Sequence, residues 1–155
     1  MLPAVIFIGT IMPSFPPSML DTISTKAEET LCFKTGNLYE GRLAEETIME
    51  GRGTYKWAAQ SVSYAGDFHS NSIDGSGQYA WADGSTYDGE VVAGMRHGAG
   101  TFTGKGGFPR YEGQWKEGRR HGQGKLVYSD GGDVYEGEWI DDMREGQASI
   151  LGRVS

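Results

Sequence analysis

The stretch Tyr111-Glu112-Gly113-Gln114-Trp115 recurs, with small changes, along most of this chain. Five copies place a glycine two residues after a tyrosine and a large apolar residue four residues after it, and the tyrosines are 25, 23, 24 and 24 residues apart. In the last four copies another glycine follows the tyrosine by eleven residues. So regular a period predicts a repeat protein. The opening tyrosines are Tyr39, Tyr64, Tyr87, Tyr111 and Tyr135.

Each copy has the pattern of a β-hairpin. Alternate side chains of a strand share a face, so Tyr111, Gly113 and Trp115 are expected to point the same way. Glycine inside a strand marks a close approach, and we expect an aromatic ring from the neighbouring strand to lie over it. Successive hairpins predict an all-β fold in which one open antiparallel sheet grows along the chain. Glycine-containing turns are expected within copies at 93–96 and 117–120, and Asp-Gly turns between copies at 82–85 and 129–132.

The composition fits a small repeat domain and excludes several other classes. The 155 residues allow one domain, and the 25 glycines show no collagen period. An aromatic content of 12% is too high for a disordered chain. The single cysteine, Cys32, rules out a disulfide framework, and the net charge of −7 argues against nucleic-acid binding.

The start of the chain differs from the rest. Residues 1–29 are predicted to be an unstructured leader and polar linker, because residues 1–20 carry no charge and hold four of the five prolines. The apolar run 2–12 is too short for a transmembrane helix, and no basic residue precedes it as in a secretory signal. The repeat domain is predicted at 30–155, with a half repeat at 30–38 that places Leu31 and Phe33 like the second arm of a hairpin. Full repeats are predicted to start at 39, 64, 87, 111 and 135.

These residues resemble the MORN repeat over about 39–150. The Y-x-G-x-W pattern, a glycine-containing turn and an H-G-x-G pattern occur together in the copies that hold His97-Gly98 and His121-Gly122. The resemblance implies an elongated, twisted, single-layer sheet used for attachment and assembly and not for catalysis. Residues 79–92 are most similar to the MORN-type radial-spoke head proteins of cilia and flagella. That similarity implies a cytoplasmic, cytoskeletal protein of the axoneme that assembles with other proteins.

Two sets of residues are candidates for binding partners. A single-layer sheet leaves its aromatic face partly open, and an exposed aromatic face is typical of a partner surface. Residues 94–127 carry a charge of +5 while the rest of the chain carries −12, so this basic centre is a candidate site for an acidic partner or anionic lipid. The alternative function is therefore a peripheral membrane adaptor. The aromatic candidates are Tyr64, Tyr79, Trp81, Tyr87, Tyr111, Trp115, Tyr135 and Trp139, and the basic candidates are Lys116, Arg119 and Arg120.

An enzyme is not expected, nor is a cofactor. The segment 104–107 lacks the other positions of a phosphate-binding loop, and no nucleophile–base constellation is recognisable. His97 and His121 lie 24 residues apart, which leaves a metal site open, but we favour a repeat position whose side chain closes a turn by hydrogen bonding. The neighbouring acids Asp141-Asp142 are expected to be solvated in a turn. A regulatory repeat attached to a catalytic domain is a further alternative.

Overall fold

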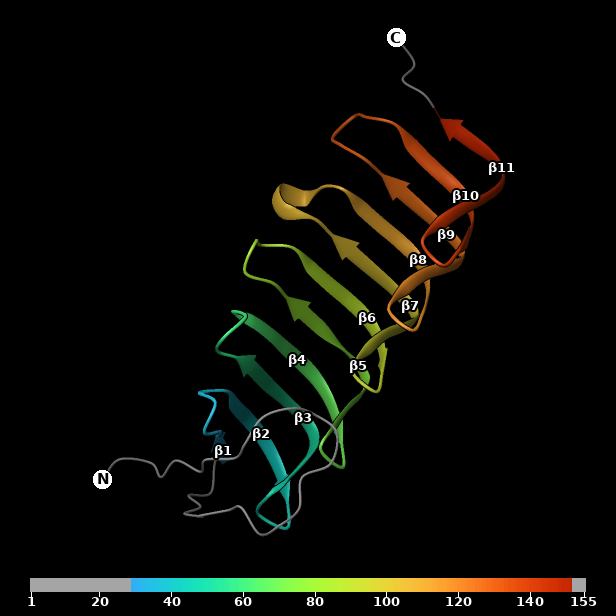
Figure 1. The fold of residues 1–155 in the computed structure, drawn as a ribbon. Coiled ribbons are helices and arrows are strands. Elements are labelled where there is room, and N and C mark those ends of the chain that lie inside the picture. Colours follow the sequence, from blue (N-terminus) through green and yellow to red (C-terminus); the bar gives the residue numbers. More distant parts are fainter. Residues whose placement is uncertain (1–28, 152–155) are drawn as a thin grey trace. The chain divides into compact units, whose positions relative to one another are not determined.

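The computed structural model describes residues 29–151, and their fold is built from β-strands (Figure 1). Apart from the short 3-10 turn η2 (Lys105–Gly107), no helix occurs among these residues. The predicted leader lies outside the described residues except for Glu29, which already belongs to the first strand. The strands are β1 (Glu29–Cys32), β2 (Leu38–Ala44), β3 (Ile48–Trp57), β4 (Val62–His69), β5 (Ser72–Ala80), β6 (Thr86–Val92), β7 (Met95–Thr103), β8 (Arg110–Lys116), β9 (Arg119–Val127), β10 (Val134–Ile140) and β11 (Met143–Leu151).

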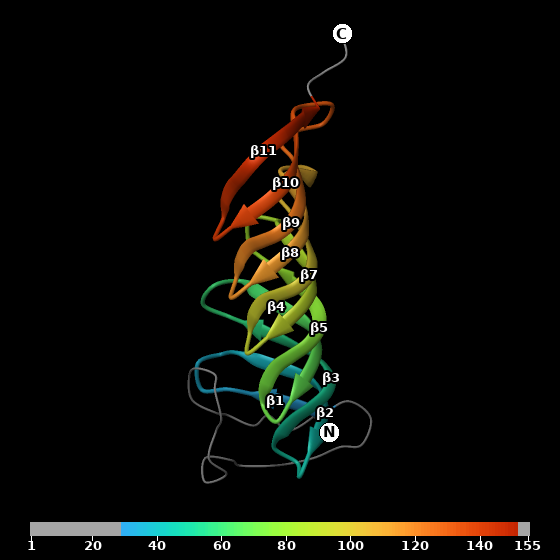
Figure 2. The same cartoon turned by 90° about the vertical axis from the view of Figure 1, so that its right-hand side faces the viewer.

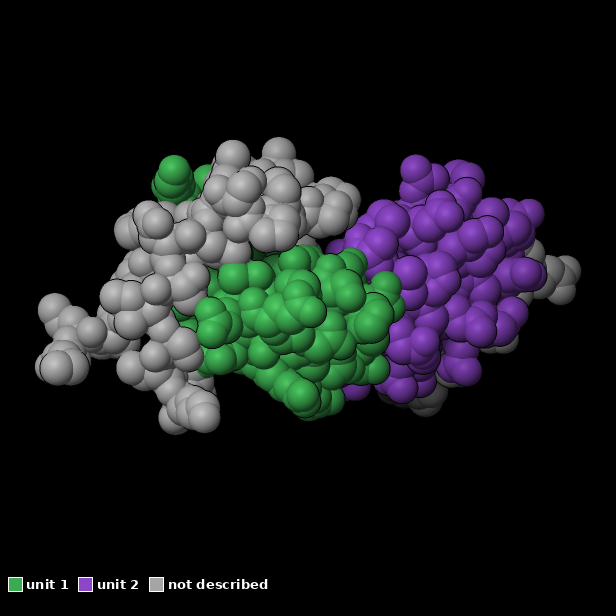
Figure 3. All heavy atoms as spheres, turned by 90° about the horizontal axis from the view of Figure 1, so that it is seen from below, with its two compact units in different colours: residues 1–82 green, residues 83–155 purple. Residues whose placement is uncertain are grey.

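The chain forms two compact units, one ending at Ala82 and the other starting at Asp83 (Figure 3). Within the first unit β1 to β5 pair in chain order, and within the second β6 to β11 do the same. The described pairings are antiparallel, and the ribbons show the marked twist that is normal for such strands (Figure 2). The prediction of an all-β fold made of consecutive antiparallel hairpins is confirmed.

Each complete hairpin places its tyrosine and its glycines at fixed register positions. In β8 and β9, Tyr111 lies opposite Leu126 and Gly113 lies opposite Gly124. The register then shifts, so that Trp115 lies opposite Arg120. Shifts at the corresponding place occur in the other four hairpins, after Gly41, Gly66, Gly89 and Glu136. A bulge of this kind increases the local twist of a strand.

The glycines leave room for the tyrosine of their own repeat. A Cβ atom added to Gly124 would lie 2.5 Å from Cζ of Tyr111, and one added to Gly113 would lie 2.7 Å from its hydroxyl oxygen. The expected ring over bare backbone is therefore present, and it covers a glycine of its own strand as well as one of the neighbouring strand. The same contacts occur between Tyr39 and Gly53, Tyr64 and Gly77, and Tyr87 and Gly100.

Strand β1 takes the position of a hairpin's second arm. Leu31 lies opposite Tyr39, as Leu126 lies opposite Tyr135 between β9 and β10. Leu31 and Phe33 are both buried. The carboxylate of Glu29 accepts a hydrogen bond from the backbone N–H of Leu43 (2.8 Å). The segment before the first full copy is thus integrated into the sheet of its unit.

The turn of one hairpin is hydrogen-bonded to the second arm of the preceding hairpin. The N–H of Gly118 donates to the carbonyl oxygen of Arg96 (2.9 Å), and that of Asp142 donates to the carbonyl oxygen of Arg120 (3.0 Å). In the first unit, Asn71 and Met49 form the same bond (3.1 Å). These turns therefore form a row along one edge within each unit.

Candidate interaction surface

Seven of the eight aromatic candidates lie in the interior. Their relative exposures range from 0 to 8%, and Trp81 alone of the eight is half-buried. The expectation of an aromatic face left partly open is therefore wrong for these seven, because the twisted hairpins bring the side chains of both arms together over the glycines. Such side chains offer a partner almost no area in the folded chain. The seven are Tyr64, Tyr79, Tyr87, Tyr111, Trp115, Tyr135 and Trp139.

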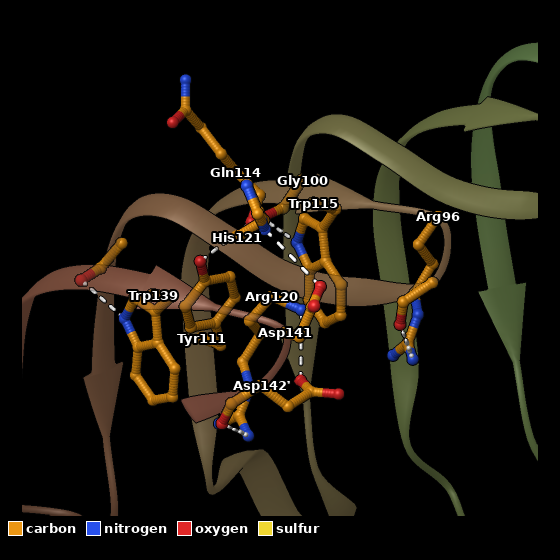
Figure 4. A network of polar contacts seen from close by, with 12 residues as sticks. Arg96, Gly100, Tyr111, Gln114, Trp115, Arg120, His121, Trp139, Asp141 and Asp142 are labelled. Carbon is orange, nitrogen blue, oxygen red and sulfur yellow. Dashed lines mark hydrogen bonds and ion pairs between the residues drawn. The ribbon is translucent and has the colours of Figure 1, made fainter. Parts of the chain in front are cut away.

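The tryptophans connect one repeat to the previous one. Nε1 of Trp115 donates to the carbonyl oxygen of Gly100 (3.0 Å), and Nε1 of Trp139 donates to that of Gly124 (3.2 Å). The Trp139 ring packs edge-on against Tyr111 of the previous copy, with ring centroids 5.4 Å apart (Figure 4). Edge-to-face pairs of this kind add stability beyond the area they bury.

An arginine at a repeated position covers these rings. The guanidinium carbon of Arg96 lies 4.2 Å from the ring centroid of Trp115, and that of Arg120 lies 4.2 Å from that of Trp139 (Figure 4). Arg96 also donates to the carbonyl oxygen of Gly118 (2.7 Å). Arg144 takes the same position over Tyr135, at 5.6 Å. This layer was not predicted from the sequence, although the 24-residue spacing of the three arginines is a signal for it.

The three basic candidates differ in how much of their charge is accessible. Arg120 is engaged in the interior: its Nε donates to Oδ1 of Asp142 (2.8 Å), and its side chain is 26% exposed. Arg119 is exposed and forms a long ion pair with Asp141 (3.9 Å). Lys116 is exposed at the end of β8. Arg119 and Lys116 are therefore available to an anionic partner, while Arg120 is committed to the turn of the next hairpin.

Asp142 is held by Arg120 and is not the freely solvated acid expected from its position in a turn. Its Oδ1 accepts hydrogen bonds from both the backbone N–H (3.1 Å) and Nε (2.8 Å) of Arg120. Burial would raise the pKa of Asp142, but the hydrogen bonds and positive charge of Arg120 outweigh burial and hold the pKa below its usual value. In the first unit Asn71 has the same role, since its Oδ1 accepts from the N–H of Met49 (2.8 Å).

The substitution Asp142→Asn is expected to lower stability at neutral pH by about 1 kcal/mol or less, since the partly exposed ion pair is lost while the amide oxygen still accepts. A depressed pKa in the folded state contributes stability above the unfolded pKa of about 4 and loses it as pH falls through the folded value. The gap between wild type and variant should therefore shrink as the pH is lowered from 7 to about 3. Urea unfolding at several pH values measures it, and a gap that widens in acid would contradict the assignment.

The position that holds histidine in two copies contacts the turn of the following hairpin. Glu50, at this position in the first copy, accepts from the N–H of Ser70 (2.8 Å) and pairs with Nδ1 of His69 (3.0 Å). His121 has its buried Nδ1 3.7 Å from Asp141, with no hydrogen bond. The expected role of closing a turn by hydrogen bonding is thus supported at Glu50. The turn that Glu50 closes is that of the following hairpin, and not the turn of its own hairpin. Among residues 29–151 no group of His, Cys, Asp and Glu has the arrangement of a metal site.

The buried tyrosines should titrate late. Burial raises the pKa of Tyr39, Tyr64, Tyr87 and Tyr111 to about 12. A phenol whose folded pKa exceeds its unfolded value stabilises the fold below about pH 10 and ceases to do so as pH rises through the folded value. We expect these phenolates to form together with loss of the β-sheet signal between pH 10 and about 12. Phenolate absorbance followed in parallel with circular dichroism measures this, and full ionisation at pH 10 with the sheet intact would contradict it.

A row of exposed side chains follows the turn edge of the second unit on the face opposite the aromatic interior. The row consists of three pairs, one at each turn. The first residue of each pair comes directly after a buried residue at the end of a strand, and the second is the first residue of the returning strand, paired opposite it. The pair at the first turn is apolar, the pair at the second is basic and the pair at the third is apolar. The three pairs, here called the rim row, are Val92 with Met95, Lys116 with Arg119, and Ile140 with Met143.

Membrane-spanning helices are not found in the part of the chain that the structure describes. A family model described as the MORN repeat matches residues 46–62, 64–86, 87–107, 111–133 and 135–150. The matched segments cover well over half of the chain, and the first begins inside the copy that opens at Tyr39. No curated protein sequence matches the chain.

Proposed function

This chain belongs to the MORN-repeat family, and from that premise we propose that it is a non-enzymatic scaffold that assembles proteins in the axoneme of cilia and flagella, as part of a radial-spoke head. Repeats of this family suggest a scaffold for protein or membrane interaction. The placement in a radial-spoke head rests on the similarity of residues 79–92 to radial-spoke head proteins. It implies a cytoplasmic, cytoskeletal location.

The observation that supports the scaffold role is that each repeat has a recurring interior and an exposed turn whose residues differ between repeats. The pattern of tyrosine, glycine and apolar residue that recurs in every copy forms the interior. Tyrosine hydroxyls also bond to the backbone there: Tyr111 donates to the carbonyl of Gln114 (2.9 Å) and Tyr135 to that of Glu138 (2.8 Å). What changes from repeat to repeat is the exposed turn edge. A repeated interior combined with turns that differ from copy to copy is suited to binding partners along a row of turns.

The proposal that the chain is not an enzyme is supported by the structural roles of charged side chains that could otherwise act in catalysis. In the described residues, Arg120 and Asp142 bond to each other across repeats. Glu50 bonds to the turn of the next hairpin. These groups stabilise the stacking of hairpins, which gives each of them a structural function.

The first experiment is fractionation of ciliated cells that express the tagged full chain. Retention in detergent-extracted, salt-washed axonemes, followed by cross-linking to radial-spoke components, is the expected result. Absence from axonemes would overturn the proposed location. An axonemal chain that cross-links to no spoke component would overturn the assignment to the spoke head.

A peripheral membrane adaptor is the second candidate function, because exposed Met95 and Met143 lie on the same edge as the exposed cations Lys116 and Arg119. Apolar side chains next to basic ones are typical of proteins that lie on anionic membranes. Recovery of the chain in the detergent-soluble membrane fraction would favour this function. The substitution Arg119→Glu should then release it.

A further inference from the structure

We propose that the rim row binds a protein segment in which an acidic side chain lies between two apolar ones. This inference rests on the proposed scaffold function and specifies the partner surface. It follows from three features of the row: the exposure of its apolar pairs, the like charges of its central pair, and the spacing of the three turns.

The apolar pairs are the most exposed large apolar groups on this edge. Relative exposure is 45% for Val92, 46% for Met95, 39% for Ile140 and 65% for Met143. Each pair faces across one hairpin, so two apolar side chains lie together at each of two turns. Grouped exposure of this kind is typical of an interaction site, whereas single exposed apolar residues are not.

The central pair places two positive charges opposite each other. Lys116 and Arg119 are directly paired across β8 and β9, and like charges at such positions destabilise a sheet. The nearest compensation is the 3.9 Å ion pair of Arg119 with Asp141, in which both side chains are at least half exposed. An exposed pair of that length contributes little, so a carboxylate brought between the two cations would relieve the repulsion.

The spacing of the turns sets the length of the partner segment. Neighbouring strands lie about 4.8 Å apart, so the two apolar pairs, four strands from each other, are separated by about 19 Å. A segment in the polyproline II conformation rises about 3.1 Å per residue with three residues per turn, so about six residues cover this distance and every third side chain points the same way. Its acidic side chain would then lie about three residues from each apolar one.

A protein segment fits this edge better than an anionic membrane. The turns also carry the exposed acids Glu117 and Asp141, which offset the two cations locally, and the whole chain has a net charge of −7. A membrane presents negative charge over its whole surface and would meet these acids as well. A single carboxylate between Lys116 and Arg119 has only to replace the long ion pair of Asp141 with Arg119.

The test is selection of a displayed random peptide library on the full chain, followed by affinity measurement with an enriched synthetic peptide. Enriched peptides should carry an acidic residue about three positions from apolar residues on each side. The double variants Lys116→Glu with Arg119→Glu, and Met95→Ser with Met143→Ser, should each weaken binding at least tenfold. A peptide whose acidic residue is replaced by lysine should bind the Lys116→Glu, Arg119→Glu variant better than the wild type.

A matched control makes the same charge reversal at the opposite edge of the sheet. Arg110→Glu reverses an exposed cation there and should leave peptide affinity within twofold. Enrichment of peptides without the acidic and apolar pattern, or affinity unchanged in both double variants, would overturn the proposal. So would binding of the wild type to phosphatidylserine vesicles that the Lys116→Glu, Arg119→Glu variant loses while no peptide competes for it.

Axonemal retention of the same variants separates this inference from the proposed function. If the rim-row variants fail to bind peptide but stay in salt-washed axonemes, the surface is not the attachment site and the scaffold function stands. If the wild type itself is absent from axonemes, the proposed axonemal location is wrong, whether or not the rim row binds peptides. Circular dichroism of each variant confirms that the sheet is retained.

Discussion

The substitution Gly113→Ala is expected to destabilise the second unit by about 3 kcal/mol, enough to leave a large fraction of the chain unfolded at moderate urea concentrations. An added Cβ atom would lie 2.5 Å from Cα of Gly124, and 2.7 Å from both the carbonyl oxygen of Gln123 and the hydroxyl oxygen of Tyr111. Two of these three atoms belong to the backbone of the paired strand. The clash can therefore be relieved only by separating β8 from β9 at the bulge.

Gly118→Ala is the matched control for the loss of a glycine. Gly118 lies in a turn with φ of +82° and has no atom within 4 Å of the added Cβ, so its substitution costs only the strain of a left-handed residue, about 1 kcal/mol. Urea unfolding followed by circular dichroism compares the two variants. If Gly113→Ala loses no more stability than Gly118→Ala, the close packing of β8 on β9 is not what the glycine provides.

The hairpin repeat could be predicted because its signals are local. Tyr111, Gly113 and Trp115 alternate with polar residues, and the tyrosine returns at nearly constant spacing, so the direction and order of the strands follow from one period. The register shift after Gly113 does not, because no residue marks it in the sequence. Even the ring over the glycine was predictable, because a glycine inside a strand requires something to occupy the space of its side chain. In the half repeat predicted at 30–38, Leu31 lies opposite Tyr39, as expected for the second arm of a hairpin.

The candidate site was harder to predict because burial depends on how strongly the hairpins twist. A sheet without a second layer was expected to leave Trp115 and Trp139 partly open on one face, and that expectation made them partner candidates. In the structure the arms are bulged and twisted, and the guanidinium groups of Arg96 and Arg120 lie over these rings. Arg120, which the net charge of residues 94–127 made a candidate for binding an anionic partner, is thus bonded to Asp142 and packed on Trp139. A count of charged residues does not show which of them already have a partner within the fold.

The rim row could not be predicted either, because its exposed residues do not recur from copy to copy. Val92 and Ile140 follow the conserved apolar position of their strands, and Lys116 occupies the equivalent place between them. Positions that vary between copies cannot be recognised from a period. They are found only when the register shows which of them lie at neighbouring turns.

The substitution Trp139→Ala is expected to destabilise the second unit by about 4 kcal/mol. Trp139 is 2% exposed, and its ring lies 5.0 Å from that of Tyr135 and 5.4 Å from that of Tyr111. Its loss also leaves the carbonyl oxygen of Gly124 without this donor and removes the ring beneath Arg120. Trp139→Phe should recover part of the loss, since it keeps an aromatic ring but not the N–H group.

Ile140→Ser is the matched control, because Ile140 is the next residue along β10 and points to the opposite, solvent-exposed face. Its substitution should change stability by no more than about 1 kcal/mol, as for other surface positions. Urea unfolding of the three variants, together with axonemal retention of the two Trp139 variants, distinguishes a structural tryptophan from one that binds a partner. If Trp139→Ala remains as stable as the wild type but is lost from axonemes, Trp139 contacts the partner and the interior assignment is wrong. If stability falls as expected, any loss of retention follows from unfolding, and the partner surface must be sought on the opposite face, where Ile140 and Met143 are exposed.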